Sequence, residues 1–213
     1  MRHLALFSGV ALALCAPLSV MADDTANLKV TGTISPASCG VSLASGSEVN
    51  LGTVRLSDFK PGEDLKLEAK TASLSIACNG GPAFFRLRAS DATGGVSDGS
   101  AHYGLGQNDQ SGESKSNGYF ELSIDAESMS ANKFVLKSTD SGAGQAWASA
   151  GSGKVPFAHD DETFAFAADA AATSPVALAS LTVPLKIEAV LAKDPTVNDE
   201  VELAGQATIE ILY

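Results

Sequence analysis

Short segments in which apolar and polar residues alternate run through most of the chain, and they constrain the fold more than any other feature. In Ala72–Cys78 and in Leu181–Leu191 the apolar residues recur at every second position. This period of two is that of a β-strand with one buried face. Clusters of turn-forming residues, such as Asn79–Pro82, separate the segments. The sequence therefore predicts an all-β chain folded as a β-sandwich.

Other segments of the chain leave their structure less certain. Pro184 lacks the N–H group of a central ladder, so its strand is expected to be at an edge there or bulged. Ala165–Ala172 fits either one or two helical turns or a strand that runs through Phe164 and Phe166. The stretches Asp91–Gly118 and Ser141–Gly153 are rich in Gly, Ser and Asp and are expected to be loops.

Residues 1–22 have the features of a secretory signal peptide. A short basic start precedes an apolar run that ends near Leu14, and Val20 and Ala22 flank the cleavage position before Asp23. The apolar run is too short to anchor the chain permanently in a bilayer. The chain is therefore expected to be exported, and no later segment predicts a membrane span.

Two cysteines, Cys39 and Cys78, remain after the predicted cleavage. An even pair in an exported chain indicates one disulfide. The bridge would close a loop of about 39 residues, which is worth roughly 4 kcal/mol in the chain-entropy model. Neither cysteine lies in a CxxC pair, so the sequence does not predict a zinc site or thiol redox chemistry.

Charge and motifs argue against several classes of function. The formal net charge is −11, which disfavours binding to nucleic acid and to anionic membranes. The sequence has no GxSxG, HExxH or phosphate-binding glycine loop, so neither an enzyme nor a cofactor is expected. The single tryptophan, Trp147, either contacts a ligand or plugs the end of the core.

Alternating apolar rows lie at both ends of the chain. The N-terminal row consists of Leu28, Val30, Gly32 and Ile34. Its glycine packs nothing, and its place near the predicted mature start is one where chain order is usually poor. The C-terminal row consists of Ala207, Ile209, Ile211 and Tyr213. If no strand follows this last one, its edge carries unpaired backbone groups to which another chain can add as a strand.

With these features, nearly the whole mature chain resembles the subunits of chaperone–usher pili. Four features carry the resemblance: the Leu28–Ile34 pattern with Cys39 seven residues after its glycine, the segment Val49–Val54, the strand that ends at Cys78, and the alternating C-terminal strand that ends in a tyrosine. The chain is longer than the usual major subunit, and its tyrosine is terminal and not penultimate. It is most similar to a poorly characterised branch of β-fimbrial subunits.

The resemblance implies an incomplete immunoglobulin-like β-sandwich that lacks its last strand. Residues 23–35 would be a donor-strand extension and residues 36–213 the pilin domain. A periplasmic chaperone would lend a strand until, at an outer-membrane usher, the extension of a neighbouring subunit replaces it. Leu28, Val30 and Ile34 would enter the neighbour's groove, and Gly32 would lie at a pinched point. The protein would then be part of a cell-surface fimbrium of a Gram-negative bacterium that supports cell adhesion.

A second interpretation stays open. The long polar stretch Asp91–Gly118 is compatible with a freestanding secreted β-sandwich that binds a carbohydrate or surface ligand through its loops. In that case the N-terminal strand would pair within its own chain, and the purified protein would be a stable monomer.

Overall fold

The structure is a computed structural model that describes residues 28–33, 38–44, 46–93, 101–110, 112, 114–129, 134–139, 146–151, 153–159 and 161–213. The chain divides into two compact units, Met1–Ile34 and Ser35–Tyr213. In the first unit, residues 28–33 belong to no strand, and Leu28 and Val30 are 89% and 85% exposed. The predicted signal peptide, residues 1–22, lies outside the described residues.

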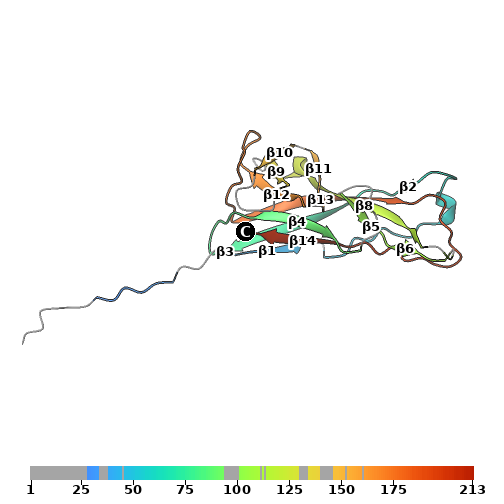
Figure 1. The fold of residues 1–213 in the computed structure, drawn as a ribbon, viewed down its shortest axis with the longest axis horizontal. Coiled ribbons are helices and arrows are strands. Elements are labelled where there is room, and N and C mark those ends of the chain that lie inside the picture. The colour runs from blue at the N-terminus through green and yellow to red at the C-terminus, as the bar shows by residue number, and fades with distance from the viewer. Residues whose placement is uncertain are drawn as a thin grey trace, which may run out of the picture. The chain divides into compact units, whose positions relative to one another are not determined.

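The second unit contains a large antiparallel sheet, which we call the first sheet (Figure 1). Its strands follow the order β1-β3-β13-β8-β11, with β2 paired to β13 and β5 paired to β8. Their bounds are β1 Ser38–Leu43, β2 Leu65–Lys66, β3 Lys70–Asn79, β5 His102–Gly104, β8 Gly118–Asp125, β11 Lys154–Pro156 and β13 Ser180–Leu191.

A second sheet has the strand order β10-β9-β12-β4-β14 (Figure 1). Its strands are β4 Arg86–Asp91, β9 Phe134–Ser138, β10 Ala148–Gly151, β12 Thr163–Ala167 and β14 Ala207–Leu212. A separate hairpin pairs β6 Gln107–Asn108 with β7 Lys115–Ser116, and two single 3-10 turns, η1 Leu56–Asp58 and η2 Ala126–Ser128, complete the described elements. None of the helical segments in the described part of the chain is long and apolar enough to cross a membrane.

The two sheets pack face to face like a sandwich because each strand buries one side. Along β13 the residues Leu181 to Leu191 are buried at every second position, as the alternation predicts. The facing side chains from the second sheet include Leu87, Phe164 and Phe166, all at most 1% exposed. These residues form one continuous core with Val183 and Ile124 of the first sheet. The prediction of an all-β chain with two packed antiparallel sheets is confirmed.

Pro184 lies where β13 has a neighbour on one side. It is paired with Ser73 of β3, whereas the pairing of β13 with β8 begins one residue later, at Leu185. The strand is therefore at an edge at Pro184 and central beyond it, which confirms the expectation from the missing N–H group.

The predicted disulfide between Cys39 and Cys78 is present. It joins β1 to β3 at a position where the two cysteines are direct partners in the antiparallel register. The bridge therefore fixes the first strand of the unit to the interior of the first sheet.

Several segments differ from what their composition indicates. The stretch Asp91–Gly118 was expected to be a loop, but it contains the short strands β5, β6 and β7. The stretch Ser141–Gly153 contains β10. Short strands of two to four residues are held by neighbours on other strands, so composition alone misses them. Phe164 and Phe166 lie in a strand, which settles the alternative left open for that segment, and Trp147 is half-buried just before β10.

Candidate strand-binding groove

Two strand edges in the second unit carry no further strand. β1 ends the first sheet and pairs only with β3, and β14 ends the second sheet and pairs only with β4. The Ala92 N–H group donates to the carbonyl of Gln206. Because backbone groups alternate in direction along a strand, the even residues of β14 point toward β4 and the odd ones point away. Ala207 and Ile209 thus direct their N–H and C=O groups to the open edge.

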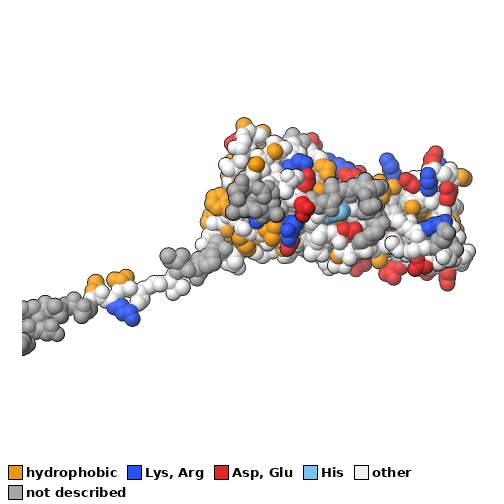
Figure 2. All heavy atoms as spheres, viewed as in Figure 1, with side chains coloured by type: hydrophobic (Ala, Val, Ile, Leu, Met, Phe, Trp, Pro, Cys, Tyr) orange, Lys and Arg blue, Asp and Glu red, His pale blue; other side chains and the backbone are white. Residues whose placement is uncertain are grey.

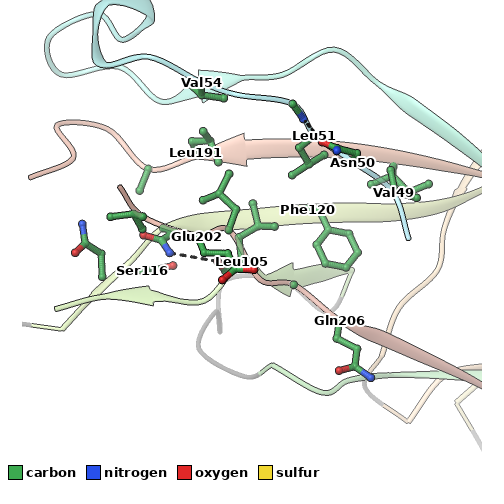
Figure 3. Close-up of a pocket in the computed structure, with 18 of the residues that line it drawn as sticks. Val49, Asn50, Leu51, Val54, Leu105, Ser116, Phe120, Leu191, Glu202 and Gln206 are labelled. Atoms are coloured by element: carbon green, nitrogen blue, oxygen red, sulfur yellow. Dashed lines mark hydrogen bonds between the residues drawn. The ribbon is translucent and has the colours of Figure 1, made fainter. Parts of the chain in front are cut away.

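A groove of about 690 Å³ lies between these edges (Figure 3). One wall is the segment 47–54, which follows β1, and the other wall is the segment 200–209, which leads into β14. The floor is apolar and comes from strands β3, β8 and β13 and from Leu105. Figure 3 shows Leu51, Phe120 and Leu105 around the same space, whereas Gln206 points away from it. We call this feature the groove.

The first wall offers backbone groups without a backbone partner. Within the described chain, the N–H groups of residues 47–54 donate to no main-chain carbonyl. One of them, on Gly52, donates to the side-chain oxygen of Asn50 at 2.7 Å, with Gly52 at a φ of +82°. Such a free edge beside an apolar floor is a template for an added strand.

The second wall is fixed by side-chain hydrogen bonds from the β6–β7 hairpin. The Gln110 side-chain oxygen accepts from the N–H groups of Asn198 and Asp199 at 2.7 and 2.9 Å. The Asn108 amide donates to the Thr196 carbonyl at 2.9 Å. The wall is thereby held in place before any strand enters the groove.

The groove floor has two apolar basins. The first basin belongs to the main core and includes Leu43, Ala72, Leu122, Leu185, Ile187 and Ile209. The second basin belongs to a smaller cluster and includes Leu51, Val54, Leu105, Leu191 and Leu203. Phe120 packs against both clusters and therefore lies at the boundary between the basins.

One end of the groove region is closed by Tyr213. Its hydroxyl accepts a hydrogen bond from the Cys39 N–H group and donates one to the Cys39 carbonyl at 3.0 Å. This contact joins the end of β14 to the start of β1, and we call it the clasp. The lining of the groove begins at Leu43 and Ile209, beyond the clasp.

The structure places the candidate residues of the two apolar rows differently. Ala207, Ile209 and Ile211 are half-buried against the core, and Tyr213 is 63% exposed in the clasp. Leu28 and Val30 are exposed, and a Cβ atom added to Gly32 would have no neighbour within 4 Å. Ile34 lies outside the described residues.

Sequence reasoning missed most of the residues that shape the groove. Val49–Val54 was expected to be a strand, but it forms a wall without strand pairing. Phe120 was assigned to a strand with no further role. Gly205 gave no signal because an isolated glycine near a turn-rich stretch is common.

An ion-pair network crosses the face of the first sheet that is opposite the core. The Lys154 ammonium lies 2.8 Å from Glu121 and 2.5 Å from Glu188, and Lys186 also contacts Glu188 at 3.2 Å. Burial acts to lower the pKa of Lys154, but hydrogen bonds to the two carboxylates outweigh it and raise that pKa. The hydrogen bond from Lys154 lowers the pKa of Glu188. A lowered carboxylate pKa stabilises the fold above the unfolded pKa, and this stabilisation is lost as the pH falls through the folded pKa.

Comparison with known proteins identifies a similarity in the N-terminal third of the chain. A family model described as a protein of unknown function (DUF1120) matches residues 28–95. The match begins at Leu28 and extends past the end of β4, so it includes the first apolar row, the disulfide and one wall of the groove. A search of curated proteins found no match.

Proposed function

We propose that this chain is a structural subunit of a surface pilus, assembled by donor-strand exchange. A periplasmic chaperone and an outer-membrane usher would be its assembly partners, and neighbouring subunits its partners in the fibre. The fibre would be displayed at the cell surface, where it would support adhesion. In this proposal the second unit is an immunoglobulin-like sandwich that lacks its last strand.

The observation that carries the proposal is the groove between two open strand edges. Its walls supply unpaired backbone groups and its floor supplies apolar side chains, which are the two requirements of strand addition. The segment 28–34 has the matching pattern, with apolar side chains at alternate positions and full exposure at Leu28 and Val30. A groove in one copy and a strand in another are complementary surfaces of the same chain.

The energy of insertion is large enough to hold a fibre together. Full burial of one Leu, Val or Ile side chain contributes roughly 1.5–3 kcal/mol. Three such side chains on the segment 28–34 give on the order of 5–9 kcal/mol before ordering costs. Main-chain hydrogen bonds to both walls add to this value. An empty groove, in contrast, exposes apolar surface and a bare strand edge, which explains the need for a chaperone before assembly.

Gel electrophoresis of purified protein, loaded with and without boiling, tests the proposal. Strand-exchanged polymer is expected to give a ladder of regularly spaced bands that collapses to one band only on boiling. The alternative function, a freestanding sandwich that binds a ligand through its loops, requires a monomer under both conditions. A single band from unboiled surface-extracted protein would therefore contradict the pilus proposal.

A further inference from the structure

The boundary between the two basins of the groove is a rigid step. Phe120 stacks on Tyr103 with ring centroids 5.1 Å apart and an angle of 18° between the planes. Tyr103 is fully buried, and its hydroxyl donates to the Phe157 carbonyl at 2.6 Å. Because Tyr103 is anchored on its far side, the Phe120 ring has no room to move down into the core.

The wall strand itself lies directly on this step. A Cβ atom at Gly205 would lie 2.7 Å from the Gly104 carbonyl oxygen and 2.8 Å from the Phe120 ring. Neither distance is tolerated by a real side chain, so only glycine fits there. The neighbouring inward positions, Leu203 and Ala207, carry side chains. The floor of the groove is therefore raised at one inward position of the wall, between the two basins.

We propose that an inserted strand crosses this step with Gly32 of one copy opposite Gly205 of the next, over Phe120. This inference rests on the proposed function and adds the register and direction of the strand. The step excludes a side chain from the guest strand at the same level at which it excludes one from the wall. Gly32 is the one inward position of Leu28–Ile34 without a side chain.

The clasp sets the direction of the inserted strand. Only three residues separate Ile34 from Ser38, where β1 begins, so the folded unit of the donor starts within roughly 14 Å of Ile34. The groove region is closed by Tyr213 and Cys39 at the end of β14, and a folded unit cannot leave there. Ile34 must therefore lie at the opposite end, so the guest strand runs antiparallel to β14.

Direction and register together fix each contact. Leu28 and Val30 lie opposite Ile209 and Ala207 over the first basin, and Ile34 lies opposite Leu203 over the second. These are hydrogen-bonded pairs, because the odd residues of β14 direct their backbone groups to the open edge. Lys29 and Thr208 then form a non-hydrogen-bonded pair, in which Cα atoms lie about 4.5 Å apart. That spacing is within the range of a disulfide.

A cysteine panel in the full chain measures this register. Lys29→Cys is combined in turn with Thr208→Cys, Glu210→Cys and Glu202→Cys, all at exposed positions. The proposal predicts intermolecular cross-linking with Thr208→Cys at least about tenfold above the other two, because one register step of two residues moves the partner by roughly 6.8 Å. Preferential cross-linking to position 210 would overturn the register, and to position 202 the direction. No cross-link from any pair, together with no ladder from the wild type, would overturn the proposed function itself.

A compensating pair of substitutions tests the step. Gly32→Leu is expected to reduce the yield of polymer at least about tenfold, because the added side chain meets the Phe120 ring. Phe120→Ala or the milder Phe120→Leu removes the step, so the double variant with Gly32→Leu is expected to recover the polymer yield of the Phe120 variant alone. If a Phe120 variant assembles and the double variant does not, the glycine does not lie over Phe120 and the proposal is wrong.

Discussion

Replacement of Leu28, Val30 and Ile34 together by serine is expected to abolish the unboiled ladder. Each substitution removes an apolar side chain from the inserted face, at roughly 1.5–3 kcal/mol per residue. The total loss, on the order of 5–9 kcal/mol, corresponds to several powers of ten in affinity. The measurement is the fraction of surface-extracted protein that migrates as polymer without boiling.

The matched control replaces the three intervening residues, Lys29, Thr31 and Thr33, by serine. These side chains lie on the opposite face of the same strand, so the control changes as many positions but leaves the inserted face intact. It is expected to retain the ladder. Equal polymer from both triple variants would show that the alternating face is not what binds, and the donor-strand account would fail.

Loss of the disulfide is the second large effect. Replacement of both Cys39 and Cys78 by serine removes a closed loop with a sequence separation of 39. The chain-entropy model predicts destabilisation by about 4 kcal/mol. Denaturant unfolding of the oxidised and substituted proteins measures this value directly, as a lower midpoint with little change of slope.

The substitution also affects the groove, since the two hydrogen bonds of the clasp are made by the backbone of Cys39. A Tyr213→Phe variant serves as the control, because it removes the clasp and keeps the disulfide. It is expected to cost no more than about 1.5 kcal/mol, the net value of an ordinary hydrogen bond. A double-serine protein as stable as the wild type would contradict the structural role assigned to the bridge.

The sequence predicts the sandwich because burial follows its alternation closely. Along β13 and β14 the half-buried and exposed positions follow the period of two in the amino-acid sequence. Pro184 was correctly placed at an edge because it lacks an N–H group, and the cysteine pair because exported chains rarely keep free thiols. Each of these signals is local, so it is legible without knowledge of neighbouring strands.

The groove could be predicted only in part. The open edge of β14 follows from its alternation and its place in the chain, but the wall at residues 47–54 does not, since the same residues would fit a strand equally well. Whether Val49–Val54 pairs depends on which edges the rest of the chain leaves free. The step at Phe120 depends on Tyr103, Gly104 and Gly205, which come from three separate segments. Such contacts have no periodicity that a sequence pattern could reveal.

The segment 28–33 shows why an isolated pattern is not a strand. It alternates as regularly as β13, yet it pairs with nothing in the described chain. A strand forms only where an edge accepts it, since an unpaired extended segment gains no ladder hydrogen bonds and buries no face. The proposal assigns that edge to a second copy.

Amide hydrogen exchange on assembled protein is the most direct test of the central claim that one copy's residues 28–34 fill the groove of another. The non-assembling triple-serine variant provides the reference for an empty groove. The account predicts that, on assembly, the amides of Ala207 and Ile209 become protected, together with that of Val30 in the donor strand, because all three form inter-strand hydrogen bonds. If these amides exchange as fast in the polymer as in the reference protein, the groove is empty in the fibre and the account is wrong.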